Sequence, residues 1–276
     1  SWRRWRSALG AVVSSLAGVL SGFLVLHVMF MPYIIGLAFL PWIFLMGEKL
    51  IEEPRARHVV VFALTIWPLT VLGLPMFLWL TLIPFGIVSA VALSRRDIGF
   101  RPMVATASGL VLGLLLGVLQ LIPQARFSAS SVRPRLSRTA AFEMSARFRH
   151  LLTLVAPSVM GGTNSWVGFR SPWLGGDLHH EVASYLGVTF LALALIGVRD
   201  LGLNRFSLSM TFVAILGIVA SLGGRTPVGV AMYRFLPYAD RFRAWNRMML
   251  WPTLAVAILA GAGARAVMRE PARLAR

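Results

Sequence analysis

Two groups of residues in this sequence have types and spacing that could support chemistry. The first is a short polar run that consists of Asp177, His179, His180 and Glu181. A carboxylate beside an imidazole can orient sugar hydroxyls or act as an acid and base. Adjacent histidines point in different directions in regular secondary structure, so the run is a poor metal site and we expect no metal. A solvated polar loop is the alternative interpretation.

The second group consists of arginines, which dominate the charge of the chain. The sequence has 27 basic and 10 acidic residues. It contains a closely spaced group and a pair four residues apart, namely Arg133, Arg135 and Arg138, and Arg243 with Arg247. The pair shares one face if that stretch is helical. Guanidinium groups match phosphate oxygens in a bidentate manner, so a phosphate ligand is one interpretation and pairing with lipid head groups is the other.

Transmembrane helices are the elements that must position these residues. Hydrophobic residues make up 57% of the chain and charged residues 13%, against roughly 45–50% and about 25% in globular proteins. Apolar runs predict eight spans, at about 8–30, 33–47, 59–73, 75–93, 102–122, 183–197, 206–222 and 248–264. The run 110–117 is apolar on every face, which excludes a β-barrel. We expect an all-α, polytopic helix bundle that forms a single transmembrane domain over 1–276.

The distribution of charge predicts the orientation of these spans. With both termini in the cytoplasm, every short basic connection lies inside, whereas the short turns near Met31 and Gly73 carry no charge. Two long segments, about 123–182 and 223–247, are then external and hold the other twelve arginines. Long loops are translocated largely regardless of their charge. These arginines therefore have no role in orientation and call for another explanation.

Several kinds of function find no support in the sequence. It has no P-loop, GxSxG or HExxH motif and no cysteine. We expect no cofactor and no nucleic-acid partner, only membrane lipids and a lipid-linked substrate. His27 lies within the first span, where a hydrogen bond to a neighbouring helix is favoured over a reactive role. Glycines at every fourth residue, Gly109, Gly113 and Gly117, predict close helix packing.

Five short motifs occur in an order that points to one family. They are Gln120-Leu121-Ile122-Pro123, Ser131-Val132-Arg133, Leu154-Val155-Ala156-Pro157 before Gly161, Glu181 followed by Tyr185-Leu186-Gly187, and Pro237 followed by Phe242-Arg243-Ala244 and Arg247. With them the chain resembles, over most of its length, the bacterial YfhO-like membrane proteins of the GT-C glycosyltransferase superfamily. The resemblance implies sugar transfer from a polyprenyl-phosphate carrier to a cell-envelope acceptor, on the extracytoplasmic face of the bacterial cytoplasmic (inner) membrane.

The chain also departs from the family pattern. Gly73-Leu74-Pro75-Met76 stands where the family tends to have Gly-His-Pro-Gln, and Trp245 replaces the proline of Arg-x-Pro-x-Arg. The catalytic acid of GT-C enzymes usually lies in the first external loop, but here the turn near Met31 is short and has no carboxylate. We therefore expect the main acid or base upstream of residue 1, and this chain to be inactive alone. A transporter or flippase of an amphipathic envelope lipid, or a non-catalytic membrane subunit, is the alternative.

The expected substrate-binding residues combine both groups with the family pattern. They are Arg133, Glu181, Tyr185, Arg243 and Arg247. The three arginines are expected to converge on the phosphate of a polyprenyl-phosphate sugar. A helix that starts at Glu181 would place Tyr185 on the same face. Glu181 itself has three interpretations, which are a helix cap, a ligand of sugar hydroxyls, or the partner of a phosphate-binding arginine.

Overall fold

The computed structural model describes residues 7–28, 30–71, 75–94, 99–131, 136–161 and 179–269. Within these ranges all regular secondary structure is helical and no strand occurs. Arg133 and Asp177, both singled out above, lie outside the described residues. The chain divides into two compact units, Ser1–His27 with Leu136–Arg276 (unit 1) and Val28–Arg135 (unit 2). The single domain over 1–276 stays a prediction.

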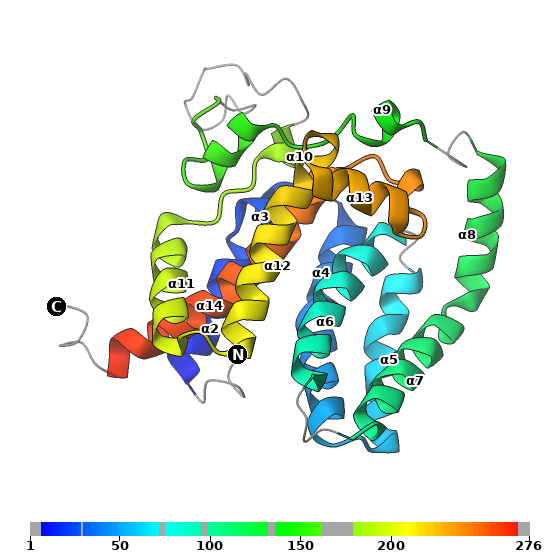
Figure 1. Ribbon diagram of the computed structural model, residues 1–276, viewed down its shortest axis with the longest axis horizontal. Coiled ribbons are helices and arrows are strands. Elements are labelled where there is room, and N and C mark those ends of the chain that lie inside the picture. The colour runs from blue at the N-terminus through cyan, green and yellow to red at the C-terminus, as the bar shows by residue number, and fades with distance from the viewer. Residues whose placement is uncertain are drawn as a thin grey trace. The chain divides into compact units, whose positions relative to one another are not determined.

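Unit 2 contains five of the helices drawn in Figure 1. They are α4 (Met31–Glu52), α5 (Ala56–Val71), α6 (Pro75–Leu93), α7 (Arg101–Leu116) and α8 (Val118–Ser130). Glycines on α7 allow it to approach α5 closely, since a Cβ added to Gly113 would lie 2.7 Å from Ile66 Cβ. This contact confirms the predicted packing role of the glycine stripe.

The predicted span 102–122 is not one continuous helix. It is broken at Gly117, where α7 and α8 meet at a bend of 69°. The Gly117 N–H donates to Leu114 O at 3.1 Å, a tightened bond that ends the α-helical pattern. A side chain at Gly117 would overlap Thr70 of α5, so only glycine fits at this bend.

Unit 1 is built around one buried helix. Its longer helices are α2 (Ala8–Val19), α11 (Val188–Leu201), α12 (Arg205–Ser221) and α14 (Leu250–Arg269). The helix α14 packs against the other three, and most of its residues from Leu250 to Ala266 are buried. Its alanines and glycines permit these close contacts. Ser14 of α2 also donates its hydroxyl to Ala257 O of α14 at 2.8 Å.

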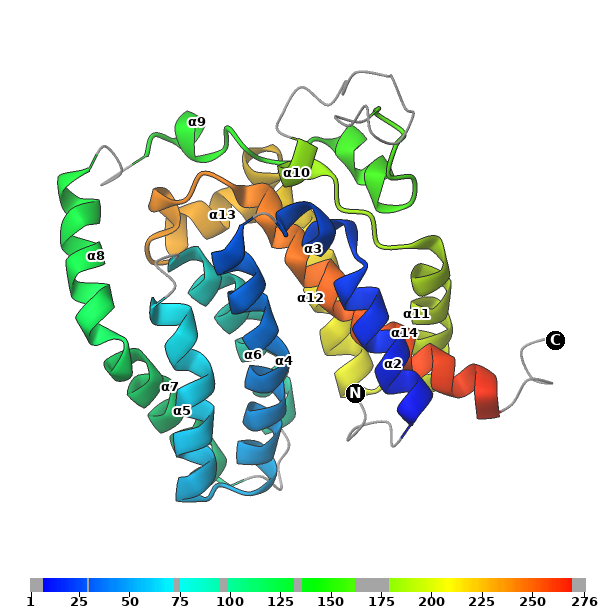
Figure 2. The ribbon, with the colours of Figure 1, turned by 180° about the vertical axis from the view of Figure 1, so that it is seen from behind.

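Short helical elements complete unit 1. They are α3 (Gly22–His27), α9 (Arg138–Ala141), η1 (Phe148–Leu154), α10 (His179–Val182), η3 (Gly223–Arg225), α13 (Pro227–Phe235), η4 (Ala239–Arg241) and η5 (Trp245–Met249). Figures 1 and 2 show α9, α10 and α13 at one end of unit 1, whereas α2 begins and α14 ends at the opposite end. The elements of unit 1 that the structure describes in the two predicted external segments include these three, so parts of both segments lie at one end of the unit. The side of the membrane that this end faces stays a prediction.

Apolar helices identify the chain as an all-helical membrane protein. Three of them are long and apolar enough to cross a bilayer, Met31–Glu52, Met76–Leu93 and Trp245–Arg269. The bent pair α7 and α8 counts as a fourth if it forms one span. Three shorter apolar helices, α2, α5 and α12, have between 10 and 17 residues. The described residues therefore support three or four spans, and eight spans remain a proposal.

Two of the predicted spans have different boundaries in the structure. The first, 8–30, is interrupted between α2 and α3, where the Gly22 N–H donates to Tyr185 O at 2.7 Å. A Cβ on Gly22 would lie 2.5 Å from the Tyr185 nitrogen, so glycine is needed for this close approach. The sixth begins at Val188 instead of residue 183. Residues 183–187 have no regular secondary structure, and Tyr185 among them contacts the break between α2 and α3.

Candidate functional site

Glu181 and Arg247 form the centre of the candidate site. Glu181 lies in α10 and is 3% exposed. Arg247 lies in η5 and donates from Nε to Glu181 Oε2 at 3.0 Å and from Nη2 to Oε1 at 2.5 Å. Two parallel hydrogen bonds of this kind are the strongest arrangement of a guanidinium and a carboxylate. The ion pair therefore fixes the short helix α10 to the chain just before α14.

Asn246 holds the same glutamate from the neighbouring position. Its side chain is fully buried, and its Nδ2 donates both to the Glu181 carbonyl oxygen and to Oε2, the latter at 3.2 Å. Asn246 and Arg247 both lie in the 3₁₀ turn η5, which precedes α14, and from this turn both side chains reach Glu181. The backbone and the carboxylate of Glu181 are thus both positioned by η5.

His27 brings a third element to this carboxylate. It ends α3, is 1% exposed, and stacks on Phe23 with ring centroids 4.4 Å apart. Its Nδ1 lies 2.8 Å from Phe23 O, so Nδ1 carries a proton and donates to that carbonyl. Its Nε2 lies 3.7 Å from Glu181 Oε2. We predicted a hydrogen bond from His27 to a neighbouring helix, but the Nδ1 hydrogen bond is made to Phe23 within α3. The other ring nitrogen, Nε2, faces the ion pair.

His180 flanks the site on the more exposed side. Its Nε2 lies 3.9 Å from Glu181 Oε1, and its ring centroid lies 6.1 Å from that of His27. Burial lowers the pKa of His180 and the pKa of His179 below the ordinary histidine value. Both imidazoles are therefore neutral at pH 7. Asp177, the remaining member of the predicted polar run, lies outside the described residues.

The charge state of Glu181 decides what it can do chemically. Burial alone would raise the pKa of its carboxyl group, but the contacts with His27 and Arg247 outweigh burial and hold the pKa well below its usual range. A general base works best when its pKa lies near the operating pH. Glu181 is therefore ionised at neutral pH, where it orients Arg247, and it is a poor acid or base.

Of the three interpretations of Glu181, the structure shows the pairing with an arginine. A cap of a long helix is excluded, because α10 ends at Val182. For the same reason, Tyr185 does not share a helix face with Glu181, and its backbone instead contacts Gly22. The Tyr185 hydroxyl accepts a long hydrogen bond of 3.4 Å from the Val188 N–H. Binding of sugar by either side chain stays a prediction.

The predicted arginine ligands are not brought together as one group. Residues 242–244 are not helical, so the four-residue spacing does not place Arg243 and Arg247 on one face. Arg243 instead donates to Glu143, in a pair whose side chains are 44% and 58% exposed. Arg133 lies outside the described residues. Among the described predicted ligands, only Glu181 and Arg247 are joined directly.

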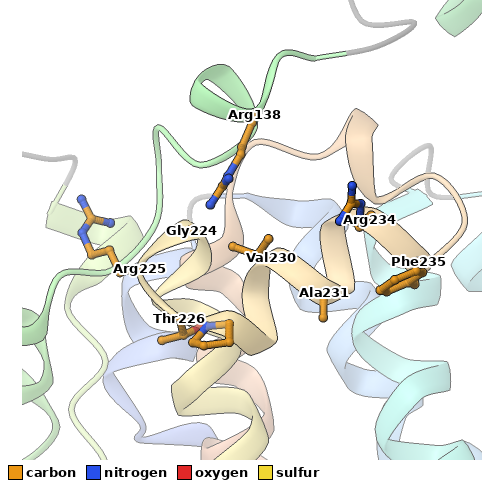
Figure 3. Close-up of a pocket in the computed structure, with 9 residues that line it drawn as sticks. Arg138, Gly224, Arg225, Thr226, Val230, Ala231, Arg234 and Phe235 are labelled. Atoms are coloured by element: carbon orange, nitrogen blue, oxygen red, sulfur yellow. The ribbon is translucent and has the colours of Figure 1, made fainter.

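A second cluster of arginines was missed by the sequence argument. Arg138, Arg225 and Arg234 line one pocket of about 460 Å³, together with Val230, Phe235 and other residues of α13 and η3 (Figure 3). They come from both segments that were predicted to be external. Spacing could not have found them, since 87 positions of sequence separate Arg138 from Arg225. The one signal in the sequence was that all three lie in predicted external segments whose arginines have no role in membrane orientation.

Metal binding and homology add nothing further to the site. In the ranges that the structure describes, no group of three or more histidines and carboxylates could hold a metal ion. The chain matches no protein-family model, no curated protein and no solved structure. Its function is therefore argued from the site and from the sequence alone.

Proposed function

We propose that this chain is part of a membrane glycosyltransferase that transfers sugar from a polyprenyl-phosphate carrier to a cell-envelope acceptor. The reaction takes place on the extracytoplasmic face of the bacterial cytoplasmic membrane, in a bundle of about eight spans with both termini of this chain in the cytoplasm. Predicted contacts of Tyr185, Arg243 and Arg133 with the donor belong to the same proposal.

One observation carries this proposal. Glu181 and Arg247 belong to two separate motifs on which the family resemblance depends, and they form a single buried ion pair. Charges are costly to remove from water, and a cluster of ionisable groups with a shifted pKa is a candidate functional site. The pair includes a residue of α10, which lies at the same end of unit 1 as α9 and α13 (Figure 1). This is the place where a lipid-linked donor would meet an external acceptor.

Under this proposal, each residue of the pair has a distinct role. Arg247 keeps 23% of its side chain exposed while Glu181 fixes its orientation. A guanidinium held in one orientation offers its charge to a phosphate with little loss of side-chain entropy. Glu181, with its lowered pKa, positions Arg247 and does not remove the proton of the acceptor hydroxyl. Acid and base catalysis is therefore assigned to residues outside this pair.

Binding of a short polyprenyl phosphate tests the proposal. The purified chain in lipid nanodiscs is titrated with farnesyl phosphate and with farnesol, which lacks the phosphate. We expect farnesyl phosphate to bind at least about tenfold more tightly, because a charge-assisted hydrogen bond contributes roughly 1.5–3 kcal/mol. Equal binding of the two compounds would contradict the proposal and would favour a non-catalytic subunit.

Variants of the pair show whether Arg247 provides this preference. Arg247→Lys keeps the charge but loses the planar fork, and it should retain part of the preference. The double variant Glu181→Gln with Arg247→Gln removes both charges, so no buried charge is left without a partner. It should abolish the preference. Arg205→Gln, an exposed arginine at the opposite end of unit 1, is the matched control and should bind as the unaltered chain does.

A further inference from the structure

The pocket lined by Arg138, Arg225 and Arg234 differs from the Glu181 site in its charge. Its three arginines come from α9, η3 and α13, and no acidic residue lines it. At this end of unit 1 the carboxylates of Glu143 and Glu181 are taken by other arginines. In the described part of the chain, no ion pair is recorded for the three pocket arginines. Among the residues that the structure describes, the lining of this pocket is therefore positively charged.

Two of the arginines, Arg138 and Arg234, lie near Val230 in the pocket, whereas the Arg225 guanidinium points away from it (Figure 3). Figure 3 shows Arg138 pointing from α9 toward Val230, and Arg234 rising from α13 on the same side. Arg225 donates from Nη1 to Ala146 O at 3.2 Å, which fixes its guanidinium while only one of its N–H donors is used. The guanidinium donors of Arg138 and Arg234 suit an oxyanion with more than one oxygen, such as a phosphate.

Apart from Thr226, the rest of the pocket lining has no polar side chain, which narrows the class of ligand. Val230, Ala231 and Phe235 line it beside the arginines, and Phe235 is 78% exposed. Tyr238, three residues further on, is 62% exposed, and exposed aromatic residues of this kind are typical of a membrane interface. A free inorganic anion would gain nothing from the apolar wall. A phosphate attached to an acyl chain would use both parts of the pocket.

We propose that this pocket binds the phosphate group of an anionic membrane phospholipid, with its glycerol and proximal acyl chain against Val230 and Phe235. Its volume of about 460 Å³ lies within the range of about 300–1,000 Å³ that is usual for small-molecule sites. The site is separate from the Glu181 and Arg247 pair and does not depend on the glycosyltransferase proposal. It anchors the α9 and α13 end of unit 1 to the lipid surface.

The test measures lipid binding to the purified chain in a non-ionic detergent. The probes are dioctanoyl phosphatidylglycerol, dioctanoylglycerol and inorganic phosphate. The phospholipid should bind at least about tenfold more tightly than the diglyceride. The double variant Arg138→Gln with Arg234→Gln should lose this preference. The double variant Arg199→Gln with Arg205→Gln makes the same change of charge at exposed positions at the other end of unit 1 and should keep it.

A second variant separates the pocket from general attraction of charge. Val230→Trp fills the space between the arginines without changing any charge, and it should also weaken phospholipid binding by about tenfold. Its thermal unfolding shows whether the chain is still folded. Equal binding of the phospholipid and the diglyceride, or an equal loss in the Arg199 and Arg205 control, would overturn the proposal. Displacement of the phospholipid by an equal concentration of inorganic phosphate would also overturn it, since the ligand would then be the free anion.

Discussion

Glu181 and Arg247, which are 66 residues apart, are joined by two hydrogen bonds that leave the glutamate almost fully buried. The pair connects α10, at the end of the first predicted external segment, to η5, at the end of the second. Asn246 and His27 complete the contacts of the carboxylate, so three separate parts of unit 1 meet at one side chain. A single substitution here should disturb all three.

Breaking this ion pair should destabilise the chain strongly. Glu181→Gln leaves Arg247 without its carboxylate, and loss of one partner of a buried pair costs about 3–5 kcal/mol. The double variant Glu181→Gln with Arg247→Met should recover part of that loss. Glu143→Gln is the matched control, because its pair with Arg243 is exposed and contributes about 0–1 kcal/mol. Thermal unfolding in detergent measures all three, and equal losses for Glu143 and Glu181 would contradict the account.

Stability should depend on Glu181 at acidic pH. Its pKa is lower in the folded chain than in the unfolded chain, so the unfolded state takes up a proton first as the pH falls. The contribution of Glu181 is therefore fully present above about pH 5 and is lost progressively below about pH 4.3, the ordinary value for glutamate. The difference in unfolding midpoint between the unaltered chain and Glu181→Gln should be constant from pH 8 to pH 5 and shrink below that. A difference independent of pH down to pH 3 would contradict this account, because it would mean that folding leaves the pKa of Glu181 unchanged.

The close approach at Gly22 should be essential for placing His27 beside Glu181. Gly22→Ala puts a Cβ 2.5 Å from the Tyr185 nitrogen, so the chain must shift and we expect a clear loss of thermal stability. Gly18→Ala is the matched control in the preceding helix, where the nearest atom would be Ala257 Cβ at 3.9 Å. Alanine favours a helix interior by up to about 1 kcal/mol over glycine, so this variant should be neutral or stabilising. Similar stability of the two variants would count against the close packing of this break.

The two ends of unit 1 should lie on opposite sides of the membrane. The chain has no cysteine, so single cysteines can be placed at Thr139→Cys, in α9, and at Leu203→Cys, between α11 and α12. Both positions are exposed. An impermeant thiol reagent applied to intact cells should label the first and spare the second. Labelling of the second alone would reverse the predicted orientation.

The helices could be predicted from the sequence because apolar length alone defines them. Each of the eight apolar runs contains a helix, since burial of backbone groups in an apolar environment leaves few alternatives. The breaks at Ser21 and Gly117 could not be read from hydropathy. They depend on close contacts with Tyr185 and Thr70, which are distant in sequence.

The candidate site was predicted in part, for a related reason. Glu181 and Arg247 stood out because ionisable residues are rare in so apolar a chain, and their pairing was one of the stated alternatives. The prediction that Arg243 and Arg247 share one helical face was wrong, because an irregular stretch and a 3₁₀ turn replace the α-helix there. His27 gave no sequence signal of its role, since only the break between α2 and α3 brings it to the glutamate.

Photocrosslinking of a donor lipid tests the central claim most directly. A polyprenyl-phosphate sugar with a photoreactive group near the phosphate is added to the chain in nanodiscs, irradiated, and the attached peptides are identified. The account predicts crosslinks to peptides that contain α10 or η5, reduced by competition with farnesyl phosphate and lost in the double variant Glu181→Gln with Arg247→Gln. Crosslinks confined to the opposite end of unit 1, where α2 begins and α14 ends, would contradict the claim that Glu181 and Arg247 form the donor site.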